Sequence, residues 1–284
     1  NSTDCAGKSW GFEMIQAPAA WELLKEHSDQ VNQDLRIGLI DGGFDDNHED
    51  LGFAETFYNQ NISEDDVSHG THVAGIMAAK SDNEAGICGV YPFGDGHLYG
   101  ASYKGIEKNG NLGSVMSEKY TLSQLILRNV KIINCSYVQA NTIVLATTYN
   151  NTKTQDDVKF LSKILGSFLQ KLLDKGYDFC IVKAAGNESN ENYIRIKYEN
   201  GKISYDPNGE IFEATPYIFG GYLSVKIEGK NKFLFFNNDK VKRSGDLDTK
   251  YSSYLTAIEK SDFPDVYDRI IVVGAVDKNR KRCD

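Results

Sequence analysis

The sequence predicts an α/β fold with helices on both faces of a doubly wound, mostly parallel sheet. Four short runs rich in Ile and Val are apolar throughout rather than alternating, which is typical of parallel strands buried on both faces. Amphipathic helical patterns lie between these runs, and strands that alternate with helices indicate a doubly wound sheet. A chain of 284 residues is long enough for one domain with a sizeable core.

Each expected element has a local signal. The strand runs are 35–41 (LRIGLID), 131–137 (KIINCSY), 178–186 (DFCIVKAAG) and 269–276 (RIIVVGAV). Helices are predicted over 17–27 and over 121–130, where Thr121 is a suitable N-cap. The strongest helical pattern covers 156–176, with one apolar stripe, an acidic start and Gly176 as a stop.

The stretch 189–265 departs from this alternation. Apolar and polar residues alternate there around the sequences ENGK, PNGE and EGKN, which is typical of β-hairpins with tight turns. We therefore expect an antiparallel β-hairpin insertion at 189–265 within a single domain of residues 1–284. Its aromatic side chains are expected to pack on one another rather than to cover a cleft.

Composition excludes some partners. The net charge of −9 argues against nucleic acid or an anionic membrane surface, because both need a basic face. No apolar run is long enough to span a bilayer, and no secretory signal is visible at the start. No CxxC pair supports a structural zinc site, and Cys135 and Cys180 lie in apolar runs that favour buried free thiols.

Polar residues follow three of the strand runs. Asp41 ends LRIGLID, Ser136 lies in INCSY, and Asn187 lies in KAAGNES, while His69 opens a helix in SHGTHVAGI. Functional groups of an open α/β sheet collect at the carboxyl ends of its strands, so these side chains are candidates for one site. Each also has an ordinary structural interpretation as a turn residue, a helix cap or a strand-end hydroxyl.

His69 and His72 are spaced to share one helical face, which raises the question of a metal site. Zinc needs further ligands, and no cluster of His, Cys, Asp or Glu follows. Because Val-Ala-Gly follows His72, we expect that imidazole to be buried and hydrogen-bonded as a structural neighbour of His69.

Taken in order, the strings IGLIDGGFDDNHEDL, SHGTHVAGIMAA, IINCSY and VKAAGNES resemble the subtilisin-like serine proteases, or subtilases. The start SWGFEMIQAPAAW and the loop SDNEAGICGVYP are similar to that family as well. The resemblance runs from about residue 10 to residue 188 and resumes at RIIVVGAVD. It implies a serine endopeptidase of the peptidase S8 type that acts on polypeptide substrates and needs no organic cofactor.

In this family an Asp, a His and a Ser form a nucleophilic triad in that chain order. The resemblance implies that Asp41 orients His69 and that His69 passes a proton from the nucleophile to the leaving amine. It also implies that Asn187 donates a hydrogen bond to the oxyanion. Ser136 and Gly186 match substrate-binding positions, where the substrate lies as an extended strand.

Two further positions concern substrate binding. The segment 99–102 (YGAS) is expected to form the opposing edge of the substrate cleft. Val138 stands where most of the family has glycine, so the preference of the first side-chain pocket is not inherited from the broad bacterial enzymes.

The resemblance also implies a structural calcium ion. Its ligands would be side-chain oxygens of Asp50 and Asn83 and the carbonyls of Ser81, Ala85 and Ile87. A turn-rich loop without metal explains the same residues.

The Gly-Thr-Ser motif that carries the family's nucleophile is absent from residues 1–284; the pair Gly70–Thr71 belongs to the His motif. We expect the serine beyond Asp284, in the full-length protein or on a second polypeptide produced by cleavage at the basic KNRKRCD. Residues 1–284 alone are therefore predicted to be inactive. The alternative is a catalytically inactive subtilase-like module that binds peptides. The family resemblance favours a secreted or cell-envelope protein, and the free-looking cysteines leave an intracellular one open.

Overall fold

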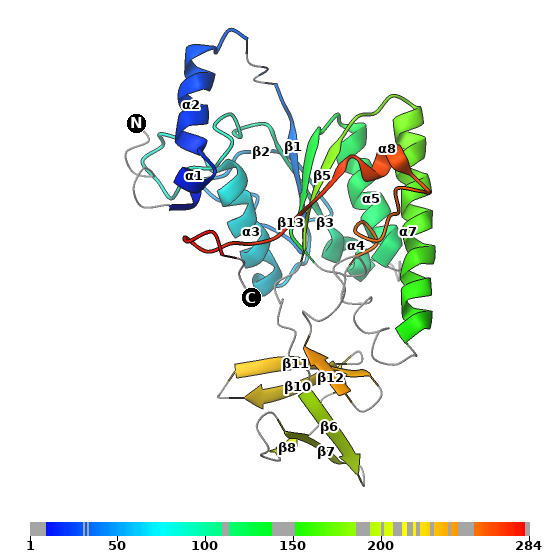
Figure 1. The fold of residues 1–284 in the computed structure, drawn as a ribbon. Coiled ribbons are helices and arrows are strands. Elements are labelled where there is room, and N and C mark those ends of the chain that lie inside the picture. Colours follow the sequence, from blue (N-terminus) through cyan, green and yellow to red (C-terminus); the bar gives the residue numbers. More distant parts are fainter. Residues whose placement is uncertain are drawn as a thin grey trace.

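The computed structural model describes residues 10–30, 32, 34–109, 114–137, 151–185 and 253–281, together with the strands between 194 and 243. Figure 1 shows a parallel sheet flanked by helices, with a second sheet drawn below it. The side chains of the second sheet lie outside the described part of the chain.

The main sheet has six strands in the order β13-β5-β4-β1-β3-β2, and every neighbouring pair is parallel. Its strands are β1 (Ile37–Asp41), β2 (Phe53–Phe57), β3 (Leu98–Ser102), β4 (Ile132–Cys135), β5 (Cys180–Ala184) and β13 (Ile270–Val273). The parallel sheet predicted from the apolar runs is confirmed, and those runs form β1, β4, β5 and β13.

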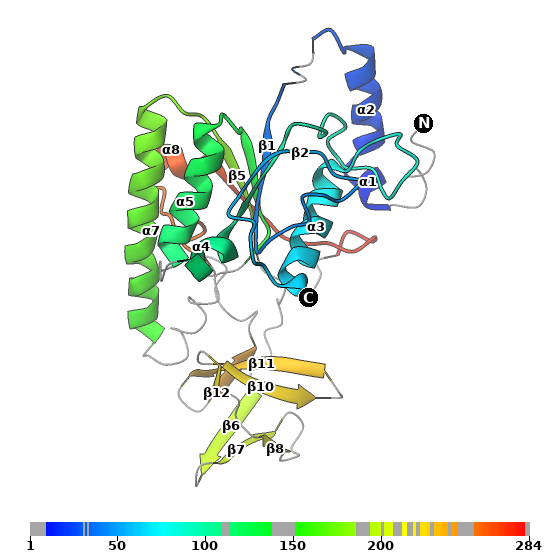
Figure 2. The same cartoon turned by 180° about the vertical axis from the view of Figure 1, so that it is seen from behind.

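Helices cover both faces of this sheet, which confirms the doubly wound arrangement (Figures 1 and 2). One face carries α1 (Trp10–Met14), α2 (Ala17–Glu26) and α3 (Glu64–Ala78). The other carries α4 (Tyr103–Asn109), α5 (Ser114–Leu127), α7 (Asn151–Asp174) and α8 (Pro264–Tyr267).

The sheet has a core on each side, and β1 contributes to both. Leu39 belongs to the cluster with Ala74 and Ala78 of α3, whereas Ile40 belongs to the cluster with Leu125 of α5. A strand buried on both faces needs apolar residues at successive positions, which explains the continuous runs in the sequence.

The start of α5 differs from the prediction. The helix begins at Ser114, so Thr121 lies in its middle rather than at its N-cap. Thr121 is buried, and its hydroxyl donates to the Ser117 carbonyl at 3.0 Å. A threonine hydroxyl can be satisfied by the preceding turn, so this residue does not have to mark a helix end.

The second sheet has seven antiparallel strands in the order β8-β7-β6-β12-β11-β10-β9. They are β6 (Ile194–Glu199), β7 (Lys202–Asp206), β8 (Phe212–Ala214), β9 (Ile218–Phe219), β10 (Tyr222–Ile227), β11 (Lys230–Asn237) and β12 (Lys240–Arg243). Further along the chain, Tyr254, Leu255 and Ile258 are buried in the core of the main sheet. The limits 189–265 of an insertion stay a prediction.

The structure shows the bonding state of three cysteines and whether any described helix could cross a membrane. Cys135 and Cys180 are free, as predicted; Cys135 is buried, whereas Cys180 is only half-buried. Cys88 is disulfide-bonded, and its partner is not among the described cysteines. Among the described residues, no helix combines the length and the hydrophobicity that crossing a membrane requires.

Candidate active site

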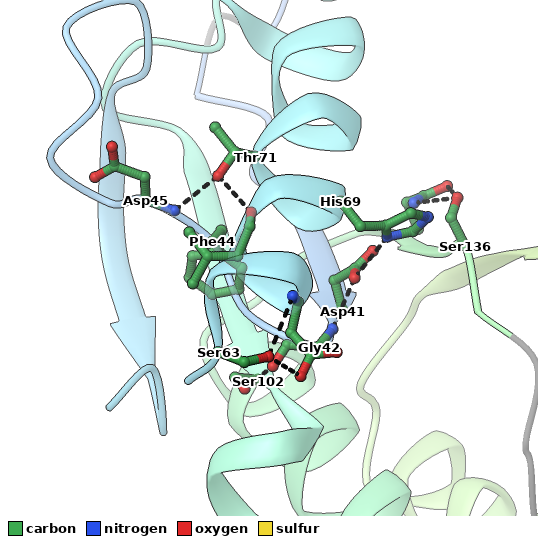
Figure 3. A network of polar contacts seen from close by, with 12 residues as sticks. Asp41, Gly42, Phe44, Asp45, Ser63, His69, Thr71, Ser102 and Ser136 are labelled. Carbon is green, nitrogen blue, oxygen red and sulfur yellow. Dashed lines mark hydrogen bonds and ion pairs between the residues drawn. The ribbon is translucent and has the colours of Figure 1, made fainter. Parts of the chain in front are cut away.

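The site is built around Asp41, the last residue of β1. Its carboxylate is buried, and Oδ1 accepts hydrogen bonds from the Gly42 amide at 2.7 Å and from Nδ1 of His69 at 2.8 Å (Figure 3). An ionised carboxylate can only accept, so the contact requires the proton of the imidazole on Nδ1. Oδ2 has no hydrogen-bond partner among the described residues. The structure thus joins the predicted Asp and His.

The loop that follows Asp41 is fixed by three side chains from other elements. The side chain of Asn59 bonds to both main-chain groups of Phe44. Its Oδ1 accepts from the Phe44 amide at 3.1 Å, and its Nδ2 donates to the Phe44 carbonyl at 2.6 Å. The amide of Asp45 donates to Thr71 Oγ1 at 2.8 Å. The hydroxyl of Ser102 donates to the main-chain carbonyl of Gly42, the residue after Asp41. This loop is therefore tied to both α3 and β3 (Figure 3).

Helix α3 presents His69. Its N-cap is Ser63, whose hydroxyl accepts from the Asp66 amide at 3.4 Å, and acidic residues fill its first turn, where the helix dipole favours them. The His69 side chain is 56% exposed, whereas the Asp41 side chain is only 3% exposed. The imidazole is held at Nδ1 and remains open to solvent, which is the arrangement of an oriented general base.

Gly70 explains how α3 comes so close to β1. A Cβ atom at this position would lie 2.0 Å from the Gly43 carbonyl oxygen and 3.1 Å from Cβ of Asp41. Only glycine permits that approach, so the residue after the histidine sets the distance between His69 and Asp41.

We therefore expect Gly70→Ala to lower the free energy of unfolding by about 1–3 kcal/mol, because the helix must move away from β1. The matched control is Gly75→Ala on the same helix, where the added Cβ would meet nothing closer than Ile87 at 3.4 Å. Urea unfolding of both variants checks this. Equal stabilities of the two variants would contradict it.

Burial dominates the electrostatics of Asp41. Loss of solvent raises the pKa of the Asp41 carboxyl, while hydrogen bonds from His69 and Gly42 lower it, and nearby Asp66 raises it further. Because the pKa is raised on folding, this group stabilises the fold at low pH, and the contribution is lost as the pH rises through its pKa. Holding an ionised Asp41 at neutral pH thus costs folding free energy.

Ser136 lies next to this pair. Ile40 pairs with Cys135, so the residues that follow them, Asp41 and Ser136, lie side by side at the ends of neighbouring strands roughly 4.8 Å apart. The Ser136 hydroxyl is hydrogen-bonded to the amide of Asn134, with Oγ–Nδ2 2.9 Å. Burial raises the pKa of the Cys135 thiol to about 12, so it stays protonated. The protonated Cys135 thiol therefore offers no nucleophile to His69, and the Ser136 hydroxyl is engaged with Asn134.

Three positions of the predicted site lie outside the described residues: Gly186, Asn187 and Val138. Their roles stay predictions.

Two expectations near the site are wrong. Residues 99–102 belong to β3, which pairs with β1 and β2 on its two sides and therefore has no free edge for a substrate. His72 is exposed rather than buried. The residues of α3 that face the sheet are Gly70, Ala74 and Ala78, and His72 points away from that stripe.

Of the predicted calcium ligands Asp50, Ser81, Asn83, Ala85 and Ile87, the last four lie in the loop after α3, and Asp50 bonds to that loop from the segment after β1. Oδ1 of Asp50 accepts from Nδ2 of Asn83 at 2.8 Å, and Oδ2 accepts from the Ile87 amide at 2.9 Å. Oδ1 of Asn83 accepts from the Ala85 amide at 3.3 Å. Each of these side-chain oxygens accepts one hydrogen bond from an N–H group. Calcium binding stays a prediction from the resemblance.

We expect Asp50→Asn to lower the free energy of unfolding by about 1–3 kcal/mol, because one N–H donor of the loop would lose its acceptor. Glu84→Gln, an exposed change in the same loop, is the control and should be neutral. Thermal unfolding in EDTA and in added calcium also tests the metal. A calcium-dependent melting temperature that Asp50→Asn abolishes would support binding, and a neutral Asp50→Asn would contradict the account of the loop.

The sequence did not indicate some residues that build the site. Asn59, Thr71 and Ser102 hold the Asp41 loop, yet a short polar side chain in a loop or at a strand end is too common to be a signal. Lys183 is different, because a lysine inside the otherwise apolar run CIVKA was a visible anomaly. It is fully buried beside β4.

Comparison with known proteins places this geometry in context. The model of the Subtilase family (Peptidase S8) matches residues 32–284. The minor extracellular protease Epr of Bacillus subtilis (strain 168) is 30% identical over 187 residues, which cover 64% of this chain and 24% of that protein. Subtilisin-like protease 2 of Plasmodium falciparum (isolate 3D7) is 27% identical over 247 residues, which cover 77% of this chain and 16% of that protein. The chain thus spans about a quarter of one relative and about a sixth of the other.

Among solved structures, fervidolysin from Fervidobacterium pennivorans, described as a keratinolytic enzyme related to subtilisin, aligns with 81% of this chain and 36% of its own. The sequence identity is 16% and the TM-score is 0.36.

Proposed function

The chain belongs to the subtilase family, and from that premise we propose that the intact protein is a serine endopeptidase in which Asp41 and His69 are two members of the triad. The observation that carries the proposal is the Nδ1–Oδ1 contact of 2.8 Å between a half-exposed imidazole and a buried carboxylate. Asp41 fixes the tautomer in which Nε2 is unprotonated, and Nε2 can then take a proton from a nucleophilic hydroxyl.

The remaining steps follow from this base. The nucleophilic hydroxyl attacks the carbonyl carbon of the peptide bond and gives its proton to Nε2 of His69. Collapse of the tetrahedral intermediate expels the amine, which takes that proton, and water then hydrolyses the acyl-enzyme by the same route. Asn187 donates its amide hydrogen bond to the oxyanion in this proposal. Substrate binds as an extended strand along the end of β4, at Ser136.

The nucleophile is proposed to lie on a segment outside residues 1–284, either continuous with this chain or on a separate polypeptide. An uncovered part of the sheet supports this. On the face that carries α3, Ile132, Ile271 and Val273 are 39%, 52% and 46% exposed. A parallel sheet normally has both faces covered. A segment packed on these residues would lie beside His69 and the end of β4.

Hydrolysis of an unfolded polypeptide tests the function. The intact protein is expected to cleave it, and purified residues 1–284 are expected not to. Turnover by residues 1–284 alone would contradict the proposed origin of the nucleophile. Peptide binding without turnover by the intact protein would favour the inactive binding module.

We also propose that the protein works outside the cytosol. The Bacillus relative is named an extracellular protease, and Cys88 is disulfide-bonded. Disulfides persist in oxidising compartments and are rare in the cytosol. Fractionation of the native source should find the protein outside the cytosol, and a purely cytosolic pool would contradict this.

A further inference from the structure

Lys183 is buried in a place where the fold calls for an apolar side chain. It lies in β5, its exposed fraction is 0%, and it pairs with Cys135 of β4. Two residues earlier in the strand, Ile181 packs into the core on the side of α5 and α7, and alternation places Lys183 on the same face. Lysine is almost never fully buried unless its charge is paired, and desolvation lowers the pKa of Lys183.

The ammonium group of Lys183 is surrounded by partners at the end of β4. Nζ lies 3.4 Å from the Cys135 carbonyl oxygen and 3.2 Å from that of Ala184, and it also donates to the carbonyl of Tyr137. Nζ further lies 4.8 Å from the centre of the Tyr137 ring, an arrangement that attracts a cation.

Tyr137 connects this ammonium to a buried carboxylate. Its hydroxyl donates to Oε1 of Glu118 at 2.9 Å, and Glu118, on α5, is only 2% exposed. The ammonium of Lys183 thus lies over the Tyr137 ring, and the carboxylate of Glu118 lies at its hydroxyl. Such a network is costly to bury, and an apolar residue at position 183 would avoid that cost.

The carbonyl groups that Lys183 binds have a common direction. The Cys180 amide of β5 donates to the Lys131 carbonyl, so carbonyls of alternate residues from Lys131 onward point toward β5. The carbonyls of Cys135 and Tyr137 share that direction, and both reach Lys183. The main-chain groups of Ser136 must then point to the opposite side, which is the side of Asp41 and His69.

The ladder between β4 and β5 ends at the pair Cys135–Lys183. The Tyr137 carbonyl lies beyond this pair, and among the described residues its donor is the side chain of Lys183. The Lys183 side chain thus bonds to the main chain two residues beyond the end of β4.

We propose that Lys183 is a positioning residue that holds residues 135–137 extended, so that the main chain of Ser136 can pair with an extended peptide substrate. This deepens the proposed peptidase function and rests on it. Lys183 touches no reacting atom in this account and acts only through the edge that it holds.

The test compares a long and a short substrate on the intact protein carrying Lys183→Met. An extended peptide pairs along the edge, whereas a nitrophenyl ester of a single amino acid does not. We expect kcat/KM on the peptide to fall about 10- to 100-fold, mainly through KM, because a charged donor to the edge is lost. We expect turnover of the ester and the rate of fluorophosphonate labelling to stay within about twofold.

Controls keep the outcomes distinct. Lys171→Met, an exposed lysine on α7, should change neither substrate. If Lys183→Met does not fold, Tyr137→Phe decides, because it removes the hydroxyl contacts with Glu118 and with the Cys135 thiol that hold the Tyr137 ring beside Lys183. A loss confined to the peptide supports the proposal. Equal losses on peptide and ester, or no loss on either, overturn it. A wild-type protein that neither cleaves nor labels refutes the peptidase function instead.

Discussion

Replacing His69 with alanine is expected to lower kcat of the intact protein by about 10⁶-fold, the loss found for this triad member in a related enzyme. His69 is the general base of the proposed mechanism, and among the described residues its imidazole is the one that Asp41 orients. Without the imidazole, the nucleophilic hydroxyl keeps its proton and attacks poorly.

The matched control for this prediction is His72→Ala. His72 lies on the same helix and is also exposed, but it does not contact Asp41. Single-turnover kinetics on a peptide measure both variants. A similar loss in both would mean that α3 is merely disturbed, and a His69→Ala enzyme within about tenfold of wild type would exclude His69 as the base.

Asp41→Asn is expected to lower kcat by about 10⁴-fold, the effect of this change in serine peptidases with the same triad. The carboxylate accepts a hydrogen bond from Nδ1 of His69 at an N···O distance of 2.8 Å. An amide can instead present an N–H group to Nδ1 and favour the wrong tautomer of His69. Asp65→Asn, an exposed change in the first turn of α3, is the control and should leave kcat within about twofold.

The same variant tests the electrostatics of the site. Since burial raises the pKa of Asp41, wild type gains stability relative to Asp41→Asn as the pH falls below that pKa. As the pH rises through it, this relative stability should be lost. Urea unfolding of residues 1–284 across the acidic range measures the difference, and a relative gain for wild type on raising the pH would contradict the assigned direction.

Much of the fold could be predicted because most strands of a parallel sheet are buried on both faces. β1, β4, β5 and β13 are visible as continuous apolar runs for that reason. β2 could not be seen, because it lies at the edge of the sheet and its residues Glu55 and Ala54 are exposed. β3 was missed as a sheet strand because its second half, Gly100–Ser102, consists of small residues. Gly100 leaves room for the ring of Phe44, whose Cζ would lie 2.4 Å from an added Cβ.

The charged residues of the site could be predicted from the sequence, whereas the residues that hold the Asp41 loop in place could not. Asp41 and His69 stand in motifs whose order is specific, and the structure joins them. Asn59 and Ser102 support the Asp41 loop from distant parts of the chain, and only the folded sheet brings them there. Lys183 was visible as a charge in an apolar run, but its partners on β4 and α5 depend on the register of the strands.

Fluorophosphonate labelling of the intact protein, followed by mapping of the modified residue, tests the central claim most directly. The account predicts one labelled serine outside residues 1–284, and no labelling when His69 is alanine. Label on Ser136 or on any other serine of this chain, or label that persists without the imidazole, would contradict it.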